Sequence, residues 1–123
     1  MRIGEFIKKV ETTKDTIRHY EELNLLKPVW INGKRHYSSK DLNDFYAIRE
    51  MKSIGLSLKE IQALFEIKYN NGCGSEKLID SVLQRLDKEI HLINEKEKEL
   101  KNKKEMINEL VRSLDRETGP RNN

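Results

Sequence analysis

The sequence predicts a mainly α-helical protein with one small β-hairpin, in which a compact N-terminal domain is followed by one long helix. Three observations predict this fold class. Two short amphipathic segments meet at a tight turn near the N-terminus, and an Asn-Gly pair separates two β-prone triplets after them. An apolar repeat of seven residues then runs through a C-terminal stretch that contains neither Gly nor Pro.

The first two helices are expected at residues 3–10 and from about residue 14 to residue 22. In the first segment the spacing i, i+3, i+4, i+7 draws one apolar stripe on two helical turns. Thr13 can cap the second helix by accepting a backbone N–H, and Ile17 and Tyr20 continue the inward face. The stripe of the first segment consists of Ile3, Phe6, Ile7 and Val10.

The segment 29–37 is expected to form a β-hairpin. Asn32 and Gly33 stand between two β-prone triplets, and a type I′ turn needs positive φ at both central residues, which Asn and Gly tolerate best. Pro28 marks the entrance to the hairpin. We interpret Trp30 as a packing residue of this hairpin rather than as a base-stacking platform.

Two capping boxes predict the third and fourth helices. Residues 38–41 and 57–60 each begin with Ser and end with an acidic residue, so a hydroxyl and a carboxylate can satisfy the free N–H groups of the first turn. Gly55 is expected to end the third helix in a left-handed conformation, and the fourth is expected to reach about Lys68. Residues 70–74 are the predicted linker. The expected core positions are Leu42, Phe45, Ile48 and Met51 in the third helix and Ile61, Leu64 and Phe65 in the fourth.

The long helix is expected from residue 75 to about residue 116, with residues 117–123 as a flexible tail. Its apolar positions step by four and three residues, which is a heptad seam. At 1.5 Å per residue the helix is about 60 Å long, more than a small domain can cover, so it needs a partner helix. One line of the seam is wholly apolar: Ile79, Leu86, Ile93, Leu100, Ile107 and Leu114. The other line turns polar in its middle: Leu83, Ile90, Glu97, Lys104 and Val111.

The composition limits the classes of protein to consider. Among 123 residues, 24 Lys and Arg stand against 21 Asp and Glu, and only 36% are apolar. Such a chain buries one modest core, which argues against a large independent enzyme. No apolar run approaches the ~20 residues of a membrane helix and no apolar signal segment follows Met1, so we expect a cytoplasmic protein with no membrane partner. The single cysteine, Cys73, cannot form an internal disulfide, which fits a reducing compartment.

Two short helices at a tight turn, followed by a hairpin and further helices, describe a winged helix-turn-helix in residues 1–70. In this arrangement the second helix can enter the major groove of double-stranded DNA while the hairpin, called the wing, reaches along the backbone. Side chains at the start of the second helix, namely Thr13, Lys14 and Thr16, are those that reach base edges. The near-neutral net charge hides a basic face on these two elements, made of Lys14, Arg18, His19, Lys34, Arg35 and His36.

Three motifs of this region resemble the MerR family of transcriptional regulators. Residues 16–21 (Thr-Ile-Arg-His-Tyr-Glu) match the recognition helix of that family, and residues 33–37 with Asp41-Leu42 match its wing and the helix that follows. Residues 55–61 match a third motif. The resemblance runs from residue 2 to about residue 68, and the spacing of the three motifs makes it far more specific than any one motif alone.

The resemblance implies which residues contact DNA. It assigns DNA contact to Arg18 and phosphate contact to His19, Tyr20, Arg35 and Tyr37. Two other interpretations stay open: Tyr20 could be an ordinary core aromatic, and Arg35 and Tyr37 could merely fill cross-strand positions on the hairpin. The complete set of expected DNA-binding residues is Thr13, Lys14, Thr16, Arg18, His19, Tyr20, Lys34, Arg35 and Tyr37.

The sequence departs from the family pattern at two positions. Glu11 stands where the family usually has Gly in the turn, and a non-Gly residue in the left-handed region costs about 1 kcal/mol or more, so a different turn geometry is possible. His19 occupies the first position of the usual Tyr-Tyr pair. This change keeps an aromatic side chain that can form a hydrogen bond, but the family's phosphate contact at this position does not carry over in detail.

The resemblance also implies the assembly and the mechanism. Family members pair their long helices antiparallel to form a homodimer, and a two-fold dimer predicts a palindromic operator. They typically activate promoters with an overlong spacer by distorting the DNA, so that RNA polymerase engages both promoter elements. This chain resembles a short member, without the usual separate effector domain after the long helix. The residues expected at the dimer interface are Leu83, Leu86, Ile90, Ile93, Glu97, Leu100, Lys104, Ile107, Val111 and Leu114.

Other chemistries are weakly supported by the sequence. No catalytic constellation is present, so we expect no enzyme activity and no cofactor. Metal-sensing relatives place a thiolate just before the long helix, where Cys73 stands, but the residues after Leu114 include no Cys, His or Met, so no metal site is expected. A thiol or metal sensor on the same scaffold, and a structural protein that organises chromosomal DNA, remain the alternatives.

Overall fold

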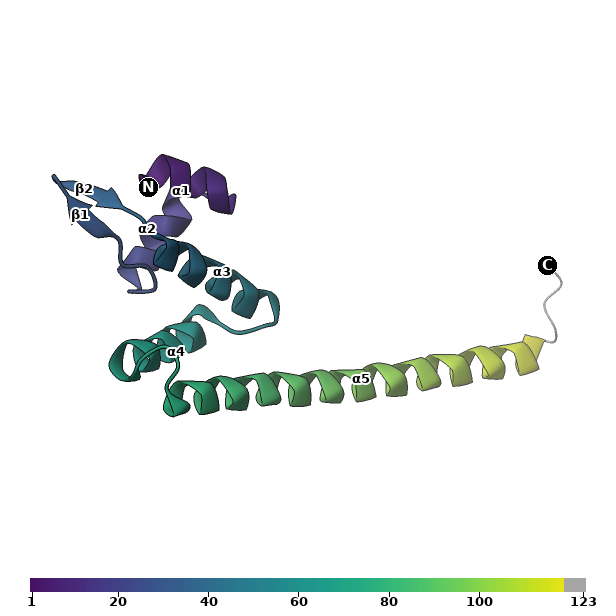
Figure 1. Ribbon diagram of the computed structural model, residues 1–123. Helices are drawn as coiled ribbons and strands as arrows, with labels where there is room; N and C mark the ends of the chain where they lie inside the picture. The colour runs from purple at the N-terminus through teal and green to yellow at the C-terminus, as the bar shows by residue number, and fades with distance from the viewer. Residues whose placement is uncertain (119–123) are drawn as a thin grey trace. The chain divides into compact units, whose positions relative to one another are not determined.

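The computed structural model describes residues 1–118 and contains five helices and one hairpin within them (Figure 1). The fold class predicted from the sequence, a helix-turn-helix with a β-hairpin and a long C-terminal helix, is confirmed. Residues 1–83 form one compact unit, and the chain from residue 84 onward forms a second. In chain order the elements are α1 (Ile3–Val10), α2 (Lys14–Glu22), β1 (Val29–Ile31), β2 (Lys34–His36), α3 (Ser39–Ser53), α4 (Leu58–Asn71) and α5 (Glu76–Thr118).

The turn between α1 and α2 is held by caps on both sides. Glu11 adopts the left-handed conformation, with φ 53° and ψ 61°, although it is not glycine. A guanidinium nitrogen of Arg49, on α3, donates to the carbonyl of Val10 and so satisfies a free carbonyl at the end of α1. On the other side, Thr13 caps α2 as predicted, because its hydroxyl accepts the N–H of Thr16 at 3.2 Å.

The core of the first unit centres on an aromatic cluster. Phe6 is fully buried, stacks on Tyr37 with ring centroids 4.6 Å apart, and meets the edge of Phe45 at 6.1 Å. The N-terminal ammonium of Met1 donates to the Tyr37 carbonyl at 2.6 Å, and the Tyr37 N–H donates to the Met1 carbonyl at 2.6 Å. The start of α1 is therefore bound to the base of the hairpin. The buried hydrophobic residues of this core are Phe6, Val10, Ile17, Tyr20, Leu25, Leu26, Tyr37, Phe45, Ile48, Leu56, Ile61, Leu64 and Phe65.

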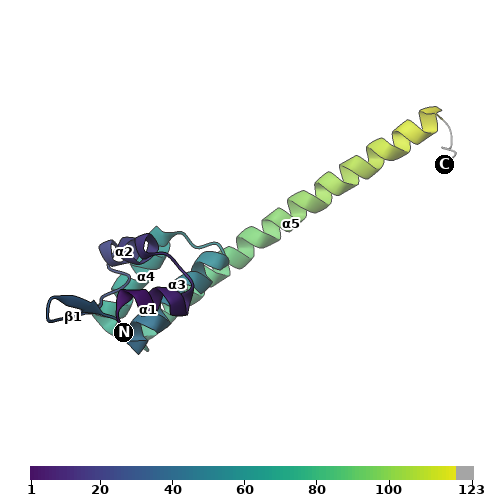
Figure 2. The same ribbon diagram turned by 90° about the horizontal axis from the view of Figure 1, so that it is seen from above.

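The hairpin forms as the sequence predicts. Its strands are antiparallel, with Trp30 opposite Arg35, and the turn residues Asn32 and Gly33 have φ of 51° and 72°. Both values are positive, as a type I′ turn requires. The hairpin projects from the helices of its unit (Figures 1 and 2). Trp30 is 59% exposed, and the Arg35 guanidinium lies 4.5 Å above its ring, so the aromatic side chain packs within the wing.

Helices α3 and α4 begin at the predicted caps. The Ser38 N–H donates to the Asp41 carboxylate at 2.8 Å, and the Glu60 N–H donates to the Ser57 hydroxyl at 3.1 Å. Gly55, with φ 110°, follows the end of α3 as expected. An ion pair between the buried Asp44 on α3 and the partly buried Lys68 on α4 joins the two helices.

The end of α4 differs from the expectation. The helix continues to Asn71 rather than ending near Lys68, so the first two residues of the predicted 70–74 linker are helical. The Asn71 side-chain amide donates to the Ile67 carbonyl at 3.1 Å, which supplies a local bond that offsets the low helix propensity of Asn. The stop signal is instead Gly72, whose φ is 93° and whose N–H donates to the Lys68 carbonyl at 2.8 Å.

Helix α5 begins where Ser75 accepts the N–H of Leu78 at 3.2 Å and ends two residues later than expected, at Thr118. Residues 119–123 of the expected tail lie outside the described residues. Leu78 is buried and Val82 packs against the core of the first unit. Most seam residues beyond them are exposed in the single chain, from 48% at Val111 to 65% at Leu100. These large exposed side chains are Ile79, Leu83, Ile90, Ile93, Leu100, Ile107, Val111 and Leu114.

The left-handed Glu11 generates a stability prediction. Glu11→Gly should raise the free energy of unfolding by about 1 kcal/mol, because glycine adopts this conformation without the clash of a Cβ. Urea unfolding followed by circular dichroism measures the change. The matched control is Asn24→Gly, also at positive φ (60°) in the native chain, where the gain should be smaller because Asn tolerates this region. A Glu11→Gly variant less stable than the parent contradicts the strain at this turn.

Candidate nucleic-acid interface

The start of α2 presents three of the residues expected to read bases. Thr13 and Lys14 are exposed and Thr16 is partly exposed. The hydroxyls of Thr13 and Thr16 lie 2.9 Å apart, so one donates to the other while Thr13 also caps the helix. Lys14 is the first residue of the helix, and its side chain is exposed. The first turn of α2 therefore offers two hydroxyls and one cation to a ligand.

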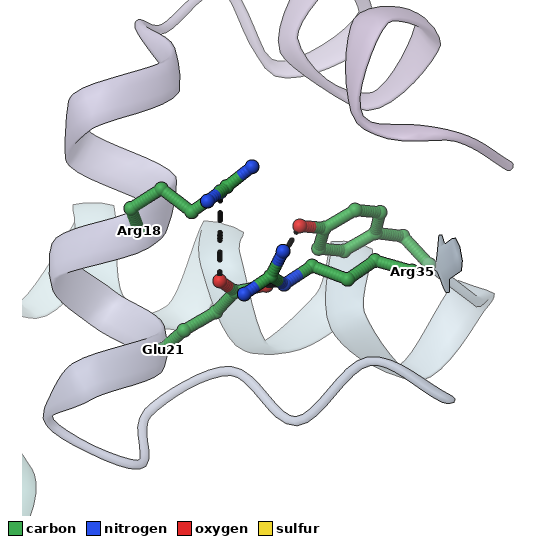
Figure 3. A network of polar contacts seen from close by, with 4 residues as sticks. Arg18, Glu21 and Arg35 are labelled. Atoms are coloured by element: carbon green, nitrogen blue, oxygen red, sulfur yellow. Dashed lines mark hydrogen bonds and ion pairs between the residues drawn. The ribbon is translucent and has the colours of Figure 1, made fainter. Parts of the chain in front are cut away.

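Arg18 on α2 and Arg35 on the wing meet at one carboxylate (Figure 3). Arg35 Nε lies 3.2 Å from Glu21 Oε1, and Arg18 Nε lies 3.9 Å from Glu21 Oε2. The Tyr37 hydroxyl donates to the same Oε1 at 2.7 Å. The Glu21 side chain is only 12% exposed, whereas the Arg18 side chain is 41% exposed. Helix α2 and the wing are thus connected through Glu21.

A cleft of about 170 Å³ lies between the start of α1, α2 and the wing. Four of its lining residues are cations: Arg2, Arg18, Lys34 and Arg35. Three of them, Arg18, Lys34 and Arg35, belong to the basic face expected from the sequence, and the structure brings these three together. Trp30 and Gly33 line the same cleft from the wing side. Cations from three elements around one opening suit a chain of phosphates.

Arg2 was not among the expected DNA-binding residues. It precedes α1, and it reaches the cleft because the backbone of Met1 is bound to Tyr37 at the base of the wing, 36 residues away in the sequence. The only local signal was its place directly before an amphipathic helix, which does not distinguish it from an ordinary surface arginine.

The two tyrosines expected to contact phosphate are buried. Tyr20 is 5% exposed, packs 5.8 Å from the Phe45 ring, and has its hydroxyl 3.5 Å from Lys52 Nζ. Tyr37 is 2% exposed, and burial together with the hydrogen bond to Glu21 raises the pKa of its hydroxyl well above the ordinary value. Both hydroxyls are engaged within the protein, so the core interpretation of Tyr20 agrees with its position. Phosphate contact by either tyrosine stays a prediction.

The remaining expected residues lie on the surface. His19 is exposed, with Nδ1 4.0 Å from a Glu22 carboxylate oxygen, and Lys34 is exposed on the wing. Thr13, Lys14 and Thr16 do not line the cleft, so the structure divides the expected set between the helix start and the cleft.

The described residues meet neither the requirements of a metal site nor those of a membrane span. Within residues 1–118, no group of three or more His, Cys, Asp and Glu side chains is placed to hold a metal ion. Cys73 is an exposed free thiol. In the described helices, no segment is both long and apolar enough to cross a membrane.

The sequence of this chain matches known regulators. The sequence model of the MerR HTH family regulatory proteins matches residues 1–67. An uncharacterized HTH-type transcriptional regulator of Pseudomonas aeruginosa is 39% identical over 69 residues, which cover 54% of this chain and 52% of that protein. The multidrug-efflux transporter 2 regulator of Bacillus subtilis is 34% identical over 109 residues, covering 87% of this chain and 33% of that protein. The chain therefore spans about half the length of these curated relatives, or less.

The structure is also similar to that of a solved regulator. The transcription regulator PbrR691 of Ralstonia metallidurans, crystallised in complex with lead(II), has a TM-score of 0.67 at 29% sequence identity. The match covers 92% of this chain and 86% of that chain. It includes the helix-turn-helix, the hairpin and the long helix, whereas the family model covers the first 67 of 123 residues. On these grounds the chain belongs to the MerR family of helix-turn-helix transcriptional regulators, which bind DNA and are not enzymes.

Proposed function

We propose that the chain is a homodimeric, sequence-specific regulator of transcription that binds a palindromic operator in promoter DNA. The observation that carries the proposal is the basic cleft, where Arg2, Arg18, Lys34 and Arg35 converge beside the exposed start of α2. Residues 1–70 supply DNA binding, and residues 75–116 supply dimerisation.

The two parts of the surface have different roles. The first turn of α2, with Thr13, Lys14 and Thr16, reads base edges, because the N-terminal residues of a recognition helix enter the major groove. The cleft cations bind the DNA backbone, where each phosphate contact releases counterions and adds affinity without reading sequence. The surface contacts of His19, and any contact of Tyr20 or Tyr37, belong to this backbone group.

The dimer uses the exposed seam of α5. Eight large apolar side chains on one helix, each about half exposed or more, leave a surface that a second helix can bury. Burial of a large aliphatic side chain contributes about 1.5–3 kcal/mol, so pairing over several heptads stabilises the dimer.

An antiparallel pairing fits the polar positions of the seam best. In one register Ile90 lies opposite Ile107 of a second copy, and the two-fold axis then falls between residues 98 and 99. The same register places Leu83 opposite Leu114 and Leu86 opposite Val111. In this register Glu97 lies about one helical turn from Lys104 of the second copy, so the polar break becomes two ion pairs. A parallel pairing stacks Glu97 on Glu97 and Lys104 on Lys104, which places like charges in a partly dry seam.

The regulatory step follows from the family resemblance. A two-fold dimer presents two recognition helices and two wings to a palindromic site, and its fixed spacing can bend or twist the DNA between the half-sites. Distortion of a promoter with an overlong spacer then lets RNA polymerase engage both promoter elements. Chromosome-wide mapping of bound sites tests this step. One or a few promoters with long spacers support it, whereas hundreds of sites without promoter elements indicate a structural DNA-organising protein.

The first prediction of this function concerns the cleft. Arg18→Ala should weaken operator binding roughly tenfold or more, and Arg35→Ala should weaken binding to all DNA and reduce the salt slope by about one. Titrations of duplex DNA at several salt concentrations measure both effects. The matched control is Arg112→Ala, which removes an exposed arginine of α5 that pairs with Glu109 and lies outside the cleft. If the two cleft variants bind operator like the control, the assigned surface is wrong.

A second prediction concerns the dimer. Ile90→Cys and Ile107→Cys, combined in a Cys73→Ser background and oxidised gently, should form a covalent dimer, because a disulfide needs Cα atoms closer than about 7 Å. Each single cysteine variant should stay uncrosslinked, since residue 90 of one helix lies about 25 Å along the axis from residue 90 of the other. Non-reducing electrophoresis reads the result. Efficient crosslinking of Ile90→Cys to itself contradicts the antiparallel register.

A third prediction separates the regulator from a thiol or metal sensor. Cys73→Ser should fold and bind operator like the parent, because a single exposed thiol offers no complete soft-metal site. Binding titrations and metal analysis of the purified protein measure this. Stoichiometric zinc or copper in the parent, lost in the variant, supports the sensor instead.

A further inference from the structure

Glu21 is an acidic residue in the middle of a basic surface. Its side chain is 12% exposed and lies between two arginines that line the DNA-binding cleft. A negative charge at this place weakens the attraction of the cleft for phosphate, so it does not serve affinity for DNA in general. The role of Glu21 therefore lies in the geometry that it imposes on the two arginines.

The carboxylate of Glu21 is itself held in place. The Tyr37 hydroxyl donates to Oε1 at 2.7 Å, and the Tyr37 ring is fixed in the core by its stacking on Phe6. Burial of this hydroxyl and its bond to the carboxylate raise the pKa of Tyr37, so the hydroxyl keeps its proton and remains a donor at neutral pH. The carboxylate therefore has a defined position relative to the core.

The two arginines are held to different degrees. Arg35 is held by two contacts, because its Nε lies 3.2 Å from Glu21 and its guanidinium lies 4.5 Å above Trp30. Arg18 Nε lies 3.9 Å from Glu21, which is an ion-pair distance but too long for a hydrogen bond. That nitrogen is buried and has no hydrogen-bond partner. Arg35 is thus held by an ion pair and a ring contact, and Arg18 is held beside it by its charge attraction to the same carboxylate.

We propose that Glu21 is a positioning residue that sets DNA specificity by holding the recognition-helix Arg18 and the wing Arg35 at a fixed spacing. The inference rests on the proposed function, because it assumes that this cleft binds DNA. Fixed guanidinium groups match only a backbone of suitable groove width and curvature, so the arrangement favours the operator. The carboxylate charge at the same time lowers affinity for every other duplex.

The test is Glu21→Gln, which removes the charge and keeps a side-chain oxygen that can accept the Tyr37 hydroxyl. The parent protein first selects its operator from a pool of random duplex DNA, and a scrambled duplex of the same composition is the competitor. Affinity for the scrambled duplex should rise several-fold, while affinity for the operator should not rise with it. The ratio of the two affinities should fall about tenfold.

The matched control is Glu22→Gln, on the same helix and adjacent in sequence. Its side chain is 78% exposed, and one of its carboxylate oxygens lies 4.0 Å from His19 Nδ1. This variant makes the same change in net charge, so it should raise both affinities together and leave their ratio unchanged. A difference between the two variants therefore reports position rather than charge.

Circular dichroism checks whether Glu21→Gln folds. If it does not, a second variant keeps the test decisive. Tyr37→Phe keeps the ring and the charge of Glu21 but removes the hydrogen bond that fixes the carboxylate. It should lower the ratio of affinities without raising affinity for the scrambled duplex. If the ratio of operator affinity to scrambled-duplex affinity is unchanged in Glu21→Gln, the inference is overturned and the proposed function stays intact. Where only Tyr37→Phe folds, an unchanged ratio in that variant has the same meaning. Failure of the parent to select any sequence overturns the proposed function itself.

Discussion

The packing of Tyr37 at the base of the wing is the interaction on which the geometry of the basic cleft depends. Its ring stacks on Phe6 of α1, its backbone is bound to Met1, and its hydroxyl reaches Glu21 on α2. One residue therefore joins α1, α2 and the hairpin. Without this junction a two-stranded hairpin of three residues per strand has little stability of its own, because an isolated hairpin is marginal in water.

The electrostatics of the chain follow from this junction. The net charge of the whole protein is only +3, yet the junction gathers Arg2, Arg18, Lys34 and Arg35 around one cleft. Such a local field attracts a polyanion although the average charge is small. The partly buried carboxylate of Glu21 lies between Arg18 and Arg35 and reduces the mutual repulsion of these two guanidinium groups.

The second unit obeys a different constraint. Helix α5 continues for 43 residues, and within residues 1–118 most of its apolar seam is exposed beyond the first turns, where Leu78 and Val82 meet the core. A lone helix of this kind exposes apolar area to water along its length, so the free energy of the chain falls when a second helix buries the seam. The proposed dimerisation, antiparallel or not, follows from this heptad pattern.

The sequence by itself determined the elements whose cause is local, and the tertiary structure decided the site. The caps at Thr13, Ser38 and Ser57 and the Asn-Gly turn were predictable because each depends on residues within about four positions. Helix α4 ends later than the sequence predicts, because Gly72 and not the preceding Asn pair supplies the residue with positive φ that stops the helix. Contacts across the fold leave no local periodic signal in the sequence. Met1 and Tyr37 are 36 residues apart in the sequence, and Tyr37 and Glu21 are 16 residues apart. For that reason only the folded chain shows that Arg2 enters the cleft, that the hydroxyls of both tyrosines are engaged within the protein, and that one partly buried carboxylate connects α2 with the wing.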